Sequence, residues 1–350
     1  MERADKGLAF MLQYDNVAWY EDGMVKILDR RIYPIKVDYV TCKTHQEVAQ
    51  AITDMVTQSG GPYIAAGMGM ALAAYEARDL DEKKMIDYLE KAAHTISNAR
   101  PTTKSRMEFV VDGCLEAAQK AINQGDKVDE AIFLHTIDAT NSKYKRMETV
   151  AKNLVDMFPK KGTIMTQCFA ETIVGMMLKE AKNRNYDLKV ITPETRPYYQ
   201  GARLTASVVA DQGFDVTVIT DNMPGYVMET KKVDVFTSAA DAICLDGHVV
   251  NKIGTFQIAL AAHYHGIPYF VTGSPDVGHP TIDTVKIEER DPDLVLESMG
   301  HRIAKEGIKG YYPAFDITPP HLVSGVVTDK GIFSPYDLHR YVEDGDTFLV

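Results

Sequence analysis

The sequence lacks the features that mark secreted, membrane-spanning and zinc-binding proteins. Its four cysteines form no close pair and no Cys-x-x-Cys, which gives no sign of a disulfide framework or a zinc site and favours a reducing compartment. No apolar run has the length of a membrane span, and residues 1–6 lead into no signal-peptide core. We therefore expect a cytoplasmic protein with no membrane partner.

The chain also has fewer basic than acidic residues. The chain carries 38 Lys and Arg against 49 Asp and Glu, a net charge of -11, and its basic residues are scattered. Binding to a phosphate backbone normally needs a basic face, so no nucleic-acid partner is expected. At 350 residues with 45% apolar and 25% charged residues, the chain is an ordinary globular protein, long enough for two domains.

The first part of the chain has mainly helical patterns after one β-hairpin. Two short β-type runs flank Asp22-Gly23 within residues 17–29, which predicts a hairpin. Thr44 is a suitable N-cap for a helix over 44–56 that carries a stripe of apolar residues. Further helices are expected at 62–78, 81–97, 104–123 and 128–158.

The second part alternates strands with helices. Strands are predicted at 162–167, 188–192, 215–220, 234–238 and 268–272, with helices at 171–183, 201–212, 223–231 and 252–265. This spacing is typical of right-handed βαβ crossovers. The fold class is therefore α/β, with a Rossmann-like doubly wound sheet in residues 141–350 and a smaller, mainly helical domain with a β-hairpin in residues 1–140.

The first strand of this sheet is not followed by a dinucleotide-binding loop. Residues 168–171 stand where Gly-x-Gly-x-x-Gly belongs, which makes an NAD enzyme improbable. Instead, three places where apolar β runs give way to polar or glycine-containing sequence hold reactive groups: Cys168, the run 194–205, and Asp241 followed by 251–255. In an open parallel sheet such places are the carboxyl edge, where ligands bind. They suggest an acid/base pair beside an anion site.

Donors for a phosphate are distributed along the chain. Arg100 precedes Pro101, so it lies in an extended or turn segment before a helix, where its guanidinium can bind phosphate oxygens in a bidentate way. The Gly60-Gly61-Pro62 turn can offer backbone N–H groups at a helix start. A plain turn that caps a buried helix explains these glycines equally well.

Several motifs, taken in order, resemble the methylthioribose-1-phosphate isomerase family. That family also contains ribose-1,5-bisphosphate isomerases and the non-catalytic regulatory subunits of the exchange factor for eukaryotic translation initiation. The resemblance spans nearly the whole chain. It is carried by Arg100-Pro101-Thr102, Thr166-Gln167-Cys168, Glu194-Thr195-Arg196-Pro197 with its continuation to Ala206, Asp241-Ala242-Ile243, Asn251-Lys252-Ile253-Gly254-Thr255 and Ile287-Glu288-Glu289-Arg290-Asp291-Pro292.

The resemblance implies an aldose-to-ketose isomerisation of a ribose 1-phosphate in methionine salvage. It maps the two catalytic groups onto Cys168 and Asp241, and contacts to the sugar phosphate onto Gln200, Asn251 and Lys252. It implies a small-molecule sugar-phosphate partner, neither cofactor nor metal, and a homodimer packed through the second domain.

Residue chemistry is consistent with these two roles. A thiol in a mostly apolar pocket keeps its proton near neutral pH, and a carboxyl in the same dry pocket has a raised pKa. The hypothesis is that Asp241 protonates the ring oxygen and that Cys168 handles the C2 proton. Taken alone, Cys168 is more often a buried inert thiol, and Asp241 is as often a cap after a strand.

The chain departs from the isomerase pattern at the phosphate and at the far end of the substrate. Residues 59–62 read Ser-Gly-Gly-Pro where Arg-Gly-Ala-Pro is usual, and Lys104 is the candidate to replace the missing charge. Phe169 makes the pocket flank more apolar, which disfavours a second phosphate at C5. The expected substrate is 5-methylthioribose 1-phosphate or 5-deoxyribose 1-phosphate. The alternatives are a ribose-1,5-bisphosphate isomerase and a non-catalytic regulatory subunit of the same fold.

Overall fold

The computed structural model describes residues 3–100 and 104–343. These residues form two compact units, one through Lys145 and one from Arg146 onward, and helix α6 (Val128–Val155) passes through the division. The sequence-based boundary at residue 140 falls in the same helix. Each unit has its own hydrophobic core.

The first unit begins with short helical turns and the expected hairpin. Strands β1 (Ala18–Glu21) and β2 (Met24–Leu28) pair antiparallel, with Asp22 and Gly23 in the left-handed conformation that a two-residue turn requires. Strand β3 (Tyr39–Cys42), which the sequence analysis missed, pairs with β2. The turns before the hairpin are η1 (Phe10–Leu12) and α1 (Tyr14–Val17).

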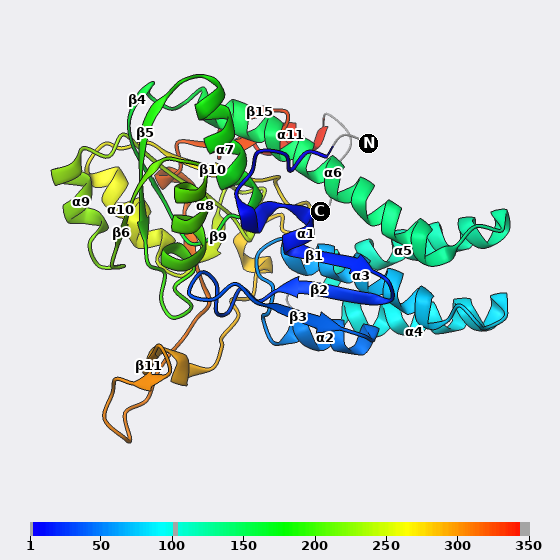
Figure 1. Ribbon diagram of the computed structural model, residues 1–350. Helices are drawn as coiled ribbons and strands as arrows, with labels where there is room; N and C mark the ends of the chain where they lie inside the picture. Colours follow the sequence, from blue (N-terminus) through cyan, green and yellow to red (C-terminus); the bar gives the residue numbers. More distant parts are fainter. Residues whose placement is uncertain (1–2, 101–103, 344–350) are drawn as a thin grey trace. The chain divides into compact units, whose positions relative to one another are not determined.

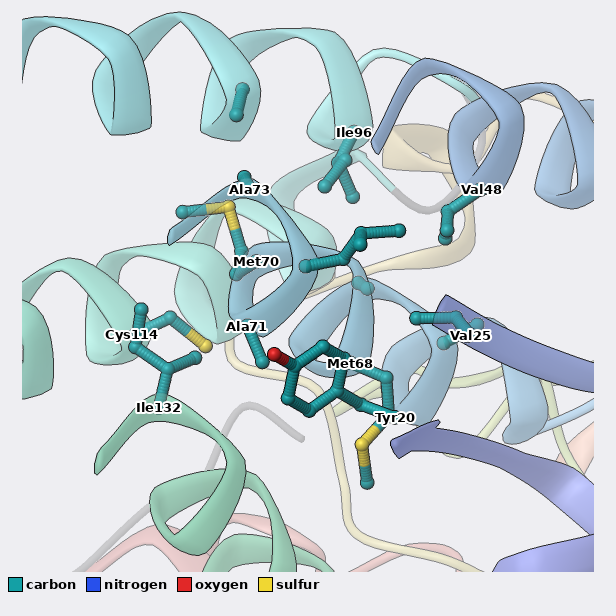
Figure 2. Packing of buried hydrophobic residues seen from close by; sticks show 14 of the residues in the cluster. Tyr20, Val25, Val48, Met68, Met70, Ala71, Ala73, Ile96, Cys114 and Ile132 are labelled. Atoms are coloured by element: carbon teal, nitrogen blue, oxygen red, sulfur yellow. The ribbon is translucent and has the colours of Figure 1, made fainter. Parts of the chain in front are cut away.

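Helix α3 (Gly61–Glu76) lies at the centre of this unit. Almost every residue from Gly61 to Ala74 is buried, because alanines and glycines let neighbouring elements pack closely around it. Figure 2 shows Met68, Met70 and Ala71 packed among side chains from the hairpin and the other helices. Those helices are α2 (His45–Thr53), α4 (Glu82–Ser97), α5 (Lys104–Gln124) and α6. Among the described residues, no helix combines the length and apolarity needed to cross a membrane.

The second unit is built on a seven-stranded sheet in the order β15-β14-β10-β7-β4-β5-β6. Figure 1 labels β4, β5, β6, β10 and β15 of this sheet. All neighbouring strands are parallel except β15, which pairs antiparallel with β14. The strands are β4 (Lys161–Thr166), β5 (Asp187–Pro193), β6 (Asp215–Ile219), β7 (Val235–Ala239), β10 (Tyr269–Thr272), β14 (Gly325–Thr328) and β15 (Gly331–Phe333). The α/β fold class is confirmed.

Helices and smaller elements complete the second unit. The helices are α7 (Thr172–Asn183), α8 (Ala206–Asp211), α9 (Pro224–Lys231), α10 (Thr255–Tyr264) and α11 (His339–Glu343), with a π-helical turn η3 (Gly201–Thr205) and 3-10 turns η4 (Ile282–Thr284), η5 (Pro292–Val295) and η6 (Pro320–Leu322). A second sheet joins β8 (Ala242–Ile243), β9 (Val249–Lys252) and β13 (Phe315–Thr318). Strands β11 (Glu297–Ser298) and β12 (His301–Arg302) form a hairpin in an arm, residues 292–311, that extends away from the sheet (Figure 1).

Two sequence-based helices differ from the structure. The helix predicted over 252–265 begins only at Thr255, because Lys252 ends β9 and Gly254 is the N-cap, with φ 102°. The helix predicted over 201–212 starts as the π-helical turn before α8. Strands β8, β9 and β13 were not predicted, since runs of two to four residues give little periodicity.

Strand order creates a topological switch point between β4 and β7. From β4 the chain proceeds to β5 and β6 on one side, then returns to place β7 on the other side of β4. Crossovers that leave a strand in opposite directions open a crevice at its carboxyl end, where ligands bind in such folds. Cys168 follows β4 by two residues and Asp241 follows β7 by two.

Candidate active site

The thiol of Cys168 lies at the carboxyl end of β4, in a tight and unusual stretch of backbone. Its φ is 58°, and that of Glu171 shortly after is 46°, both in the region that favours glycine. Non-glycine residues in this region cost free energy and concentrate at functional sites. Cys168 is buried, and its thiol donates a hydrogen bond to Oε1 of Gln200 at 3.4 Å.

Two of the predicted site residues, Lys252 and Asp241, act electrostatically on this thiol. Burial raises the pKa of Cys168 to about 11. The charge of Lys252 lowers that pKa, Asp241 raises it, and Arg290 lowers it more weakly. These side chains are therefore close enough to influence the ionisation of one thiol, and Cys168 keeps its proton at neutral pH, as the sequence predicted.

Asp241 differs from the prediction. Its backbone N–H donates to the carbonyl of Val250 at 2.8 Å, which fixes the segment after β7 against β9. The residue is exposed, so the prediction of a carboxyl in a dry pocket is wrong. The physical reason is that Asp241 lies in the two-residue link between β7 of the large sheet and β8 of the second sheet, outside the strands of both.

Strand β9 supplies two further candidates. Asn251 and Lys252 are both buried, and pairing of β9 with β13 places Phe315 opposite Lys252. The Lys252 ammonium lies 4.8 Å from the centroid of the Phe315 ring, a cation–π distance. Asn251 donates to the hydroxyl of Thr255 at 3.1 Å. Lys252 is thus a buried cation held against an aromatic ring close to the thiol.

Gln200 reaches the thiol because of the residue that follows it. A Cβ on Gly201 would lie 1.8 Å from the carbonyl oxygen of Pro193, so only glycine allows the π-helical turn to approach the end of β5 this closely. The polar run 194–205 therefore brings two side chains to Cys168: Gln200 accepts from the thiol, and the Thr205 hydroxyl donates to the Cys168 carbonyl.

Arg196, in the same run, has a structural role. The backbone N–H groups of Thr195 and Arg196 both donate to the Asp221 carboxylate, at 2.8 and 2.7 Å. The Arg196 guanidinium donates to the carbonyls of Val295 and Glu297 at 3.1 and 2.7 Å. Arg196 thus anchors the base of the arm.

Three further residues near the site were not among the site candidates that the sequence indicated. Gln167 donates to the carbonyl of Ile253 at 3.3 Å and accepts from the Thr195 hydroxyl at 3.5 Å, which links the three motifs. Asp316 accepts hydrogen bonds from the N–H groups of Gly254 and Phe256 at the start of α10. Burial raises the pKa of Asp316 to about 6, although these N–H groups oppose the shift. The hydrogen-bond partners of Gln167 and Asp316 lie about 30 to 90 positions away in the sequence, so no local pattern reveals these contacts.

Arg290, the third of these residues, belongs to the motif at residues 287–292 that contributes to the family resemblance. Its side chain is 11% exposed and makes two hydrogen bonds to Glu288, at 2.7 and 3.2 Å. The adjoining backbone pairs with the segment that leads into β13, because the N–H of Arg290 donates to the carbonyl of Tyr312 at 2.9 Å. The Arg290 side chain is therefore nearly buried, and its backbone is tied to the segment that leads into β13, the strand paired with β9.

The remaining phosphate candidates belong to the first unit. The N–H of Gly61 donates to the carbonyl of Gln58 at 3.2 Å, which differs from the anion-binding role that the sequence suggested for it. A Cβ at this position would lie 1.9 Å from the Thr57 hydroxyl, so close packing explains the glycine. Gly60 and Arg100 are partly exposed, and Lys104 pairs with Glu108 at 3.7 Å on the surface of α5.

Within the described ranges, no group of three or more His, Cys, Asp and Glu side chains is arranged to hold a metal ion.

Comparisons with known proteins match nearly the whole chain. Residues 58–335 match the model of the initiation factor 2 subunit family. Methylthioribose-1-phosphate isomerase of Thermotoga petrophila is 33% identical over 339 residues, 93% of this chain and 96% of that protein. The protein of the same name from Roseiflexus castenholzii is 35% identical over 334 residues, 91% of this chain and 94% of that one.

Solved structures agree with these sequence matches. The crystal structure of 5-methylthioribose 1-phosphate isomerase from Pyrococcus horikoshii superposes with a TM-score of 0.83 at 28% identity, over 94% of this chain and 96% of that one. Translation initiation factor eIF-2B, subunit delta, from A. fulgidus gives 0.79 at 30% identity, over 91% and 96%. The chain therefore belongs to the family that unites methylthioribose-1-phosphate isomerases with initiation factor 2 subunits.

Proposed function

We propose that this chain is an aldose–ketose isomerase, an intramolecular oxidoreductase that converts a 5-substituted ribose 1-phosphate to the ribulose 1-phosphate. The observation that carries the proposal is the buried Cys168 thiol, whose pKa responds to both Lys252 and Asp241 at the switch point of the sheet. An acid/base pair beside a cation is what the reaction needs. The names of the relatives support the substrate class.

The reaction is a set of proton transfers with no net oxidant. The ring oxygen gains a proton as its bond to C1 breaks, a hydrogen moves from C2 to C1, and the C2 hydroxyl loses its proton as it becomes the ketone. One acid and one base that exchange roles complete this cycle.

The protonation states expected at neutral pH favour one division of these roles. Burial keeps the Cys168 thiol protonated, with a pKa of about 11, so the thiol has a proton to give to the ring oxygen. We therefore assign the ring-oxygen proton to Cys168 and the C2-to-C1 transfer to Asp241, the reverse of the sequence-based hypothesis. The transient thiolate, stabilised by the charge of Lys252, recovers its proton from the C2 hydroxyl.

Phosphate binding is proposed for Gly60, Gly61, Arg100, Lys104, Gln200, Asn251 and Lys252. Lys252 has the strongest support, because a buried ammonium beside the thiol attracts an anion to that point. For Gly61 the support is weakest, since its N–H already donates to Gln58.

An apolar C5 substituent is the proposed specificity. Phe169 follows the thiol directly and is 5% exposed, so the flank that it forms is apolar. Methylthio or methyl fits such a surface, whereas the second phosphate of a ribose 1,5-bisphosphate requires further cations.

A non-catalytic regulatory subunit is the second candidate, favoured by the likeness to the subunit delta structure. The presence of both Cys168 and Asp241 at one site favours the enzyme. A panel of ribose 1-phosphates, assayed for ketose formation by the purified chain, separates the two: the isomerase produces ketose from the 5-methylthio or the 5-deoxy sugar, and a regulatory subunit produces none.

Cys168→Ser and Asp241→Asn are expected to lower kcat by at least ~1,000-fold while the protein still unfolds cooperatively, because each removes a proton carrier. Cys42→Ser is the matched control, since it changes another buried thiol in the first unit and should retain turnover. Wild-type rates in either site variant would disprove the assignment of that residue.

A further inference from the structure

Tyr312 is a buried phenol that the proposed chemistry has not used. It is 2% exposed and lies in the segment just before β13, three residues before Phe315, which packs on Lys252. The Tyr312 ring lies 5.9 Å from the Lys252 ammonium and 6.2 Å from the Tyr198 ring. Tyr312 therefore lies near both the buried cation and a second aromatic ring.

The hydroxyl of Tyr312 is the unusual part. It is buried and has no hydrogen-bond partner of good geometry among residues 3–100 and 104–343. Buried tyrosine hydroxyls nearly always have a partner, since leaving one unpaired costs free energy. Tyr269 illustrates the ordinary case, with its hydroxyl 2.7 Å from that of Ser238.

The unpaired hydroxyl belongs to the Cys168 site. The Cys168 thiolate raises the pKa of Tyr312, so the two groups are close enough to affect each other's ionisation. Burial is the larger cause of the same upward shift, and the Arg290 guanidinium opposes it through its charge and, more weakly, as a donor to the phenol oxygen, which leaves the phenol O–H without an acceptor among the described residues. At neutral pH the phenol is therefore a neutral donor beside the thiol.

We propose that the Tyr312 hydroxyl donates a hydrogen bond to the C2 oxygen of the sugar. This inference rests on the proposed isomerase function. In that reaction the thiolate takes the C2 hydroxyl proton, so the C2 oxygen comes close to Cys168 and carries growing negative charge. A preorganised donor at such an oxygen stabilises the transition state more than the bound substrate.

The test is Tyr312→Phe, assayed with the sugar 1-phosphate that the wild type converts best. We expect kcat to fall by about 30-fold or more with KM nearly unchanged, because the lost contact strengthens only during reaction. The Tm should stay within about 2 °C of the wild type, since the phenol O–H has no acceptor to lose among the described residues and Arg290 keeps its two hydrogen bonds to Glu288. The matched control Tyr269→Phe breaks the bond to Ser238, and it should lower the Tm and leave kcat at the wild-type value.

Each other outcome has a definite meaning. Unchanged kinetics would overturn the inference and leave the isomerase proposal intact. A Tm lowered by more than several degrees would mean that the hydroxyl bonds within the protein, and a rise in KM alone would place the contact on the phosphate, so both results also overturn it. A wild type inactive on the whole sugar panel would overturn both proposals together.

Discussion

Protonation of a single residue beside the candidate site, Asp316, is expected to make stability depend on pH. It accepts from two N–H groups at the start of α10, directly after Lys252 and Ile253. Burial raises its pKa to about 6, so in the folded state it is protonated where an unfolded aspartic acid is already ionised. The folded state therefore binds more protons than the unfolded state between about pH 4 and pH 6.

Stability of the second unit should reflect this linkage. Because the folded pKa is raised, the contribution of Asp316 is fully present below about pH 4 and is lost as pH rises through 6. Asp316→Asn keeps an acceptor but cannot ionise. We expect the wild type to gain on the order of 2 kcal/mol relative to this variant between pH 7 and pH 4, measured by urea unfolding at each pH. A difference that does not change with pH would contradict the shift.

At the scale of elements, the arm is attached to the sheet through the polar run after β5. Arg196 donates to two carbonyls of the arm, and the Tyr199 hydroxyl lies 2.6 Å from that of Ser298. The same run carries Gln200 to the thiol. The base of the arm and one wall of the site are therefore ordered by a single loop.

Arg196→Ala should loosen the arm. The substitution leaves the carbonyls of Val295 and Glu297 without their charged donor, a loss of about 1.5–3 kcal/mol of local stability. Hydrogen exchange by mass spectrometry should show faster exchange in residues 293–299, with the β4 amides unchanged. Arg340→Ala, at an exposed surface position, serves as the control. Equal protection of the arm in all three proteins would argue against this anchoring role.

The elements also show what the sequence can and cannot predict. Periodicity predicted the long helices and the five parallel strands β4, β5, β6, β7 and β10, because each repeats its pattern over a full element. Strand β9 was not predicted and its last residue, Lys252, was taken for the start of a helix, since a strand of four residues carries little periodic signal. Cys168 and Lys252 were found through motifs, whereas Tyr312 and Asp316 depend on pairing between distant segments. The exposure of Asp241 depends on a turn that composition does not reveal.

At the scale of the whole molecule, the arm presents apolar side chains to solvent. Met299 is 62% exposed, Ile303 65% and Tyr311 69%. Clustered apolar residues of this size commonly mark an interface between proteins. They support the proposal that two copies of the chain associate through the second unit.

Sedimentation velocity at micromolar concentration should therefore detect a dimer. Ile303→Lys should weaken association by about tenfold or more, because it places a charge within the apolar contact. Tyr264→Lys, at an 85% exposed position on α10, should leave the dimer unchanged. A wild type that sediments as a monomer would contradict the proposal.

Pairing of β9 with β13 has a consequence for how the protein is made. The ribosome synthesises Cys168 and Lys252 well before Phe315, the residue whose ring packs on the lysine. Until that late strand has emerged and paired with β9, the lysine lacks the ring that packs against its ammonium. The candidate site is therefore completed only near the end of translation. A chain that stops before residue 315 has the Cys168 thiol and Lys252 but lacks the ring that packs on the lysine.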